Sequence, residues 1–95
     1  MPAADMKARL ASLTPRQREV LRLISLGCSV AEIADILGTA TSTIDNHRTA
    51  LMAKLGIGKS VLLARIAIKY RISKVDETLT LSEKRRRGRG KDGWN

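Results

Sequence analysis

The stretch Thr41–Gly56, with the sequence TSTIDNHRTALMAKLG, constrains the fold of this chain more than any other stretch. Ile44, Leu51 and Leu55 recur at spacings of seven and four residues, which places them on one side of an amphipathic helix. The opposite side carries mainly short polar side chains: Ser42, Asp45, Asn46 and Thr49, with the larger Met52. We therefore expect a helix that buries one side and leaves a polar face free to meet another molecule.

A second short helix is predicted just before it, over Val30–Leu37. Ser29 and Glu32 have the spacing of a capping box at its start, and Gly38 permits the left-handed turn at its end. Its apolar side consists of Ile33, Ala34 and Leu37, flanked by Ile36. Two short helices joined by a tight turn are typical of a helix-turn-helix, whose second helix enters the major groove of DNA.

An earlier helix is predicted from Pro15 to about Leu26. Thr14 and Gln17 can form a capping box, and proline suits the first helical position. Gly27 is the expected stop. The predicted inward residues are Val20, Leu21 and Ile24, and the predicted outward residues are Arg16, Arg18 and Arg22.

A last helix is predicted over Val61–Ile72, with Ser60 as its cap. It is apolar almost all round, and a small core cannot cover every side of an outer helix, so the excess predicts a partner surface. A DNA reader with two-fold symmetry needs the same patch on both copies. The predicted dimer interface consists of Val61, Leu62, Ile66 and Ile68.

The chain divides into three predicted parts. Residues 1–12 form an N-terminal extension, which we expect to pack loosely although Met6 and Leu10 have helical spacing. Residues 13–73 form the helical domain. Residues 74–95 are expected to be a flexible, disordered tail, because residues 83–95 hold six Lys or Arg and two acids among polar residues and glycine. Arg87 and Arg89 are candidates for insertion into a narrow minor groove, or for a non-specific electrostatic arm.

Composition narrows the class of partner. Ninety-five residues allow one small domain, and a formal net charge of +9 favours nucleic acid or an anionic membrane. The apolar runs are too short for a membrane span or a secretory signal, and the single Cys28 fits a reducing cytoplasm. One Trp, one Tyr and no Phe argue against a reader of single strands. No metal, cofactor or catalytic group is predicted, since no nucleophile with an oriented base accompanies His47.

The stretches LTPRQREVLRLISLGCSVAEIADILG and TSTIDNHRTALMAKLGI resemble the LuxR/FixJ-type DNA-binding domain of bacterial transcription regulators. The resemblance covers Leu13 to about Ile72. It implies an all-α fold, a four-helix bundle with a helix-turn-helix and no wing. It also implies that the third helix of the bundle reads the major groove, while the fourth commonly pairs two copies of the domain.

The resemblance also suggests residue roles. In relatives, the positions of Asp45, Asn46 and Thr49 touch base edges, and Ser42 shares their face. Lys59 is a further candidate for a phosphate contact from its own charge, and the positions that the resemblance places near phosphates are Thr43, His47, Arg48 and Lys54. This chain departs from the family at Asp45, where a basic residue is usual. It departs again at Ala40, where a serine commonly caps the helix, so Thr39 or Thr41 is expected to cap instead.

Together these patterns predict a cytoplasmic regulator of transcription that binds double-stranded DNA as a homodimer, with RNA polymerase as a further candidate partner. The alternative is a protein-interaction module that keeps the fold and has lost DNA affinity, as Asp45 would indicate. A sigma-factor-like promoter reader is a weaker rival, because 95 residues hold no other sigma region. In many family members the domain follows a sensing domain, so the chain is either a stand-alone regulator or a fragment. No enzymatic activity is expected.

Overall fold

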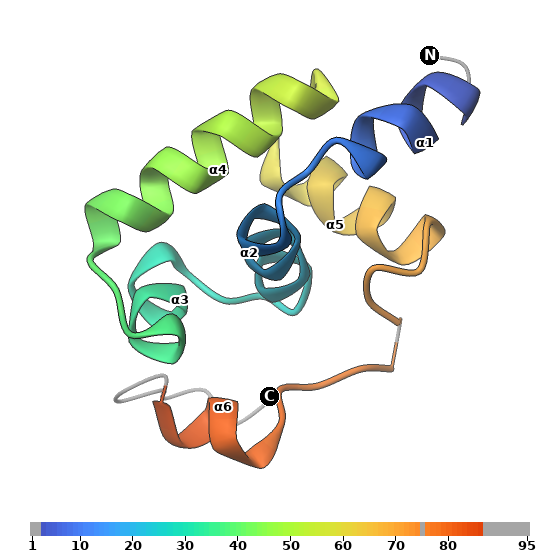
Figure 1. The fold of residues 1–95 in the computed structure, drawn as a ribbon. Coiled ribbons are helices and arrows are strands. Elements are labelled where there is room, and N and C mark those ends of the chain that lie inside the picture. The colour runs from blue at the N-terminus through green and yellow to red at the C-terminus, as the bar shows by residue number, and fades with distance from the viewer. Residues whose placement is uncertain (1–2, 75, 87–95) are drawn as a thin grey trace.

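A computed structural model describes residues 3–74 and 76–86, and the part described is all-helical, without a β-strand. The six helices are α1 (Ala3–Ala11), α2 (Pro15–Ser25), α3 (Val30–Leu37), α4 (Thr41–Leu55), α5 (Ser60–Lys69) and α6 (Leu81–Arg86). Figure 1 shows α2 in the middle of the molecule, with α4, α3, α6 and α5 arranged around it. The all-α prediction is confirmed, and α1 and α6 are additional to the four helices predicted.

Two helices begin with the capping boxes that the sequence predicts. The backbone N–H of Gln17 donates to Thr14 Oγ1 at 3.1 Å, and that of Thr14 donates to Gln17 Oε1 at 3.0 Å. At α3, Glu32 N donates to Ser29 Oγ at 3.1 Å and Ser29 N to Glu32 Oε1 at 2.8 Å. Each box satisfies two backbone donors at a helix start, so both starts are set by residues three apart.

The other two predicted caps are wrong. Ala40 occupies the cap position of α4 in extended conformation, and neither Thr39 nor Thr41 caps it, because Thr41 is already the first helical residue. At α5 the cap position belongs to Lys59, so Ser60 lies inside the helix and no side chain caps it. A side chain caps from the residue immediately before the helix. At α4 that residue is Ala40, which has no side-chain acceptor, and α5 begins one residue before the predicted Val61. The end of α5 also comes earlier than predicted, at Lys69.

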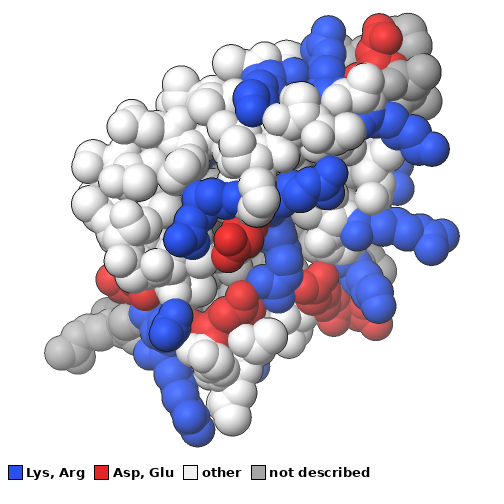
Figure 2. Space-filling view, in the orientation of Figure 1, with Lys and Arg blue, Asp and Glu red and all other residues white. Residues whose placement is uncertain are grey.

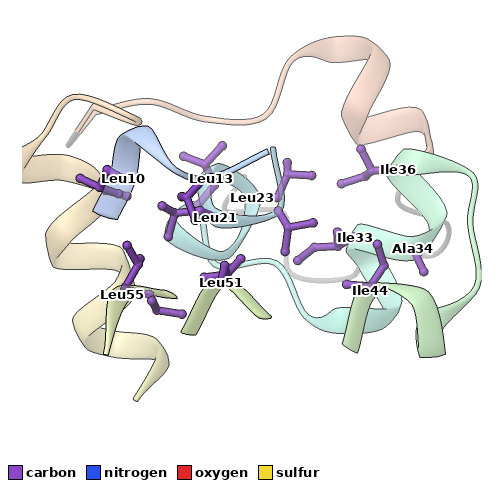
Figure 3. Packing of buried hydrophobic residues seen from close by; sticks show 14 of the residues in the cluster. Leu10, Leu13, Leu21, Leu23, Ile33, Ala34, Ile36, Ile44, Leu51 and Leu55 are labelled. Carbon is purple, nitrogen blue, oxygen red and sulfur yellow. The ribbon is translucent and has the colours of Figure 1, made fainter. Parts of the chain in front are cut away.

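The core is built around α2, which packs against α4 and α5. Figure 3 shows buried side chains of α1 to α4 meeting there. Ile44, Leu51 and Leu55 are fully buried, which confirms the predicted inward side of α4. On α3 the structure buries Ile36 and leaves Leu37 half-buried, the reverse of the predicted ranking. Ile36 points toward α6 in Figure 3, so a segment distant in sequence covers it.

The N-terminal segment is part of the core, and the expectation of a loosely packed extension is wrong. Met6, Leu10 and Leu13 are only 5%, 4% and 6% exposed. They close the side of the core on which α1 contacts α4. Met6 and Leu10 belong to α1, and burying each of these side chains contributes roughly 1.5–3 kcal/mol, so α1 stabilises the domain.

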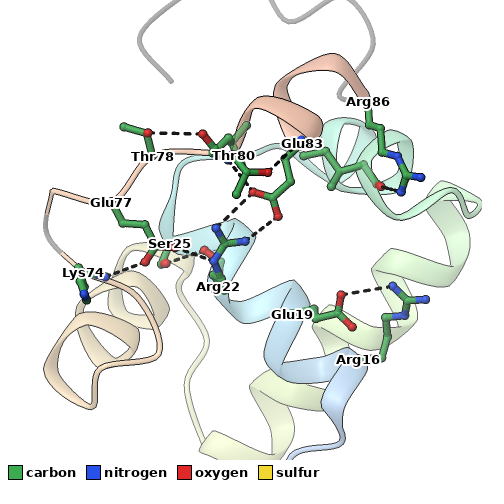
Figure 4. A network of polar contacts seen from close by, with 12 residues as sticks. Arg16, Glu19, Arg22, Ser25, Lys74, Glu77, Thr78, Thr80, Glu83 and Arg86 are labelled. Atoms are coloured by element: carbon green, nitrogen blue, oxygen red, sulfur yellow. Dashed lines mark hydrogen bonds and ion pairs between the residues drawn. The ribbon is translucent and has the colours of Figure 1, made fainter.

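Residues 76–86 form a strap that runs along α2 to α3, so the predicted disorder from residue 74 is wrong for this segment. Leu79 is 3% exposed. Arg22, predicted to face solvent, lies 2.7 Å from carboxylate oxygens of both Glu77 and Glu83 (Figure 4). Arg86 Nη1 donates to the backbone carbonyl of Ile36 at 3.4 Å. The hypotheses for Arg87 and Arg89 lie outside the described residues.

These contacts shift the ionisation of the strap. The hydrogen bond to Glu83 is the main cause that raises the pKa of Arg22. At Glu83 partial burial opposes ionisation, but the hydrogen bonds from Arg22 and Thr80 outweigh it and lower the pKa of the carboxyl group. Both shifts stabilise the charged pair in the folded state.

Candidate DNA interface

The predicted reading face is intact on α4. Its four side chains are exposed: Ser42, Asp45, Asn46 and Thr49. The buried residues Ile44, Leu51 and Leu55 hold the other side of the helix against the core. In Figure 2 the upper left, where α4 lies in Figure 1, is largely white, and most Lys and Arg side chains lie elsewhere on the visible surface. This face therefore offers hydrogen-bonding groups with little positive charge.

One flank of α4 carries Thr43, His47 and Lys54, which lie four and then seven residues apart, a helical spacing. Thr43 is exposed and His47 is half-buried. The ammonium of Lys54 donates to the backbone carbonyl of Ser12 and to Gln17 Oε1, at 3.0 Å each. An ammonium has three donors, so Lys54 keeps one for another acceptor.

Arg48 lies on the opposite flank. Its Nε lies 3.9 Å from Asp45 Oδ1, and its Nη1 lies 3.9 Å from Met52 Sδ. The Nε atom is buried and has no hydrogen-bond partner among the residues that the structure describes. The side chain borders a cavity of about 540 Å³ between the α2–α3 turn and the start of α5, where Cys28, Ser60 and Val61 also lie. Arg48 is therefore turned toward the protein in this conformation.

The structure thus keeps the base-reading candidates together and divides the phosphate candidates between two flanks. Lys59 is exposed at the cap position of α5, next to the cavity that Arg48 borders. Thr43, His47 and Lys54 lie on the other flank of α4. A helix in the major groove has a sugar–phosphate backbone on each side. Candidate phosphate contacts on both flanks of α4 are therefore compatible with this binding geometry.

The predicted dimer residues separate into two sets on α5. Val61 and Ile68 are 65% and 37% exposed and lie seven residues apart, so they share one side of the helix. Leu62 and Ile66 instead border a groove of about 450 Å³ that Met6 and Lys69 also line. Leu62 is itself 41% exposed, so Val61, Leu62 and Ile68 are the exposed members of the predicted patch and Ile66 is half-buried.

Sequence reasoning missed contacts made by Arg9, Ser12 and Gln17. Arg9 Nη1 donates to the carbonyl of Leu55, the last residue of α4, at 3.3 Å. Ser12 and Gln17 accept from Lys54, as described above. No spacing signal could reveal these contacts, because 46 residues separate Arg9 from Leu55.

Residues 3–74 and 76–86 hold no group of three His, Cys, Asp or Glu side chains that could bind a metal ion. Within the same residues no helix has both the length and the apolar character needed to cross a membrane.

The arrangement of α3 and α4, with a short turn at Gly38 and a polar outward face, defines a helix-turn-helix domain. Residues 11–67 match the family model described as bacterial regulatory proteins, luxR family. The chain belongs to this family, which confirms the resemblance carried by its helix starts and by α4. Membership makes it a DNA-binding domain of the transcription-regulator class and not an enzyme.

Several relatives share this stretch. The transcriptional regulatory protein MctR of Rhizobium johnstonii is 47% identical over 60 residues, which are 63% of this chain and 28% of that protein. UhpA of Escherichia coli is 42% identical over 66 residues, 64% of this chain and 34% of that protein. RcsB of Escherichia coli is 34% identical over 65 residues, 68% of this chain and 30% of that protein. The chain spans about a third or less of the length of these relatives. Comparison with solved structures finds no match.

Proposed function

We propose that this chain recognises a specific sequence of double-stranded DNA, with α4 lying in the major groove. The observation that supports it best is the exposure of four short polar side chains on the outward side of α4: Ser42, Asp45, Asn46 and Thr49. Because the inward side of the same helix is fully buried at Ile44, Leu51 and Leu55, the reading face is held by a rigid element.

The chemistry of these side chains suggests which bases they read. The amide of Asn46 can bond both N6 and N7 of adenine, and the methyl group of Thr49 can contact the methyl group of thymine. The carboxylate of Asp45 can accept a hydrogen bond from the amino group of cytosine, but it cannot donate to guanine. Asp45 is the fifth residue of α4 and lies beyond its first turn, so the helix dipole gives it little stabilising role and leaves base contact as its main candidate role.

The phosphate contacts are proposed on both flanks of α4. Thr43 and His47 would meet one backbone, and Arg48 and Lys59 would meet the other. Lys54 is predicted to join the first flank, but its ammonium already donates to Ser12 and Gln17. Arg48 lies 3.9 Å from Asp45, so it would have to turn away from this carboxylate to reach a phosphate. These contacts would set the position of the helix on DNA without reading the sequence.

The dimer is proposed to form through α5, with Val61 and Ile68 at its centre and Leu62 and Ile66 at its edge. A single pair of helices buries little area, so we expect a weak homodimer that two half-sites on DNA assemble. A cytoplasmic location follows from this role, and contact with RNA polymerase remains a further prediction.

One observation favours a second function, that of a protein-interaction module with weak DNA affinity. The cations of α4 are both engaged by the protein, Arg48 near Asp45 and Lys54 on Ser12 and Gln17. Non-specific affinity for DNA depends on free Lys and Arg near phosphates, so such a surface would bind DNA less tightly than a basic one.

Selection from a pool of random duplex DNA, followed by sequencing, tests the proposal. We expect enrichment of one motif, present as two inverted half-sites, and binding that weakens as salt rises. Recovery of no motif, together with salt-insensitive or undetectable binding in a gel shift, would overturn DNA reading and favour the interaction module.

A further inference from the structure

The C-terminal end of α4 is held by α1. Nearly all of α1 lies before the stretch of the chain that matches the family, which begins at residue 11. Helix ends leave carbonyl groups without partners inside the helix, and cations placed there offset the partial negative charge. At the end of α4, Gly56 N donates to Ala53 O and Ile57 N to Met52 O. The carbonyl of Leu55 instead accepts from the guanidinium of Arg9, which belongs to α1.

The same arrangement occurs in the other direction. Just past the end of α1, the carbonyl of Ser12 accepts from the ammonium of Lys54, in the last turn of α4. The carbonyl of Leu10, in the last turn of α1, accepts from Arg18 of α2 at 3.1 Å. Each of the two helices therefore supplies the cation that binds a terminal carbonyl at the other's C-terminal end.

Lys54 also connects this junction to α2. Its second acceptor, Gln17 Oε1, belongs to the capping box at the start of α2 and is part of a side chain only 7% exposed. Both acceptors of Lys54 are neutral, so its charge is not cancelled by a carboxylate. These hydrogen bonds nevertheless hold the ammonium in place relative to two helices. The ammonium of a freely solvated lysine has no such fixed position.

We propose that α1, through Arg9 and Lys54, is a brace that sets the direction of α4 and thereby the discrimination between DNA sequences. Lys54 and Arg9 are positioning residues, and their main role is not a phosphate contact. α4 packs against α2 and α3, and its last turn is in addition tied to α1 and the residue after it through Arg9 and Lys54. Because base-edge hydrogen bonds tolerate displacements of only about 0.5 Å, releasing one end of the helix would weaken the correct contacts most. This proposal rests on DNA reading by α4.

The first experiment compares Arg9→Met with Lys7→Met in a gel shift on the selected duplex and on random duplex. The two changes remove the same charge from the same helix, and Lys7 is exposed. For Arg9→Met we expect affinity for the selected duplex to fall about three- to tenfold, the range that one hydrogen bond supplies. Affinity for random duplex and the salt slope should match those of Lys7→Met.

The second experiment uses Gln17→Glu, which keeps the capping box and gives Lys54 a carboxylate partner. If Lys54 acts mainly on a phosphate, this pairing withdraws it from DNA, so affinity and the salt slope fall together. If Lys54 acts as a brace, the stronger contact keeps or increases the preference for the selected duplex. Lys54→Met should lower that preference with little change in salt slope.

Thermal unfolding by circular dichroism accompanies each variant, and gel shifts are done well below the melting temperature. A variant that melts lower but discriminates as the parent does would show a merely structural role and overturn the proposal. A salt slope lowered by about one in both Lys54→Met and Gln17→Glu would overturn it in favour of a phosphate contact. Asn46→Ala distinguishes failure of the brace from failure of the proposed function. If this variant too leaves the discrimination between duplexes unchanged, α4 does not read DNA.

Discussion

The guanidinium of Arg22 binds the carboxylate of Glu83 through two hydrogen bonds, of 2.7 and 3.2 Å, although 61 residues separate them. Its Nε also donates to Glu77 at 2.7 Å. This one side chain therefore fastens the strap of residues 76–86 to α2, and the strap in turn covers Ile36 of α3. The charges of Glu77 and Glu83 are directed inward, which leaves Lys84 and Arg85 exposed on α6.

We predict that Arg22→Ala lowers the free energy of unfolding by about 1–3 kcal/mol, since it removes charge-assisted hydrogen bonds and leaves two carboxylates close together. Urea unfolding followed by circular dichroism measures the loss. Arg16→Ala is the control, because Arg16 forms only an exposed pair with Glu19 at 3.8 Å. Equal stability of the two variants would show that the strap does not depend on Arg22.

The strap should also give the protein a pH dependence. The pKa of Glu83 lies below its ordinary value of 4.5, so the folded state favours the carboxylate. The stabilisation is present above about pH 4.5 and is lost as pH falls through the lower folded-state pKa. The stability difference between the parent and Glu83→Gln should therefore shrink in acid, and a difference that stays constant between about pH 7 and pH 3 would contradict this.

Asn46→Ala should cost about 1–3 kcal/mol at a single base pair and relax the preference there, because the amide is the side chain best suited to bond adenine. Asp45→Lys should move the preferred site toward guanine or raise affinity for all sequences. Repeating the random-duplex selection with each variant checks both outcomes. Two variants that select the parental site with parental stringency would exclude α4 as the reader.

Arg48→Ala and Lys59→Ala should each weaken binding to every sequence alike and lower the salt slope by about one. The expectation follows from their position together beside the start of α5. Lys74→Ala, in the exposed link after α5, removes the same charge and is the matched control. If Arg48→Ala keeps the parental slope, Arg48 stays on Asp45 in the complex.

Val61→Asp should abolish cooperative binding to paired half-sites and spare binding to a single half-site, because a buried carboxylate would disfavour the symmetric contact. The fold should survive, since surface substitutions usually cost under about 0.5 kcal/mol. Leu81→Asp is the matched control: its side chain is 66% exposed, against 65% for Val61, but it lies on α6. Full cooperativity in Val61→Asp would show that α5 is not the dimer surface.

The features that the sequence alone determined are local ones. The capping boxes at Thr14 and Ser29 need only residues three apart, and the left-handed turn at Gly38 needs only a residue without Cβ strain. The inward side of α4 and its polar outward face follow from the 3.6-residue period. These signals lie within a few helical turns, so the helix-turn-helix and the polar outward face of α4 could be predicted before the fold was known.

Tertiary structure alone decided what joins distant segments. Spacing could not show that Arg22 meets Glu83, that Lys54 binds Ser12 and Gln17, or that Arg9 reaches Leu55. For an exposed cation on a helix, solvent is the default expectation, and only the path of the chain brings an acceptor within hydrogen-bond distance. The burial of α1 and of the strap was missed for the same reason. The apolar side of a short segment carries no information about which other surface will cover it, and that is settled by the packing of the whole chain.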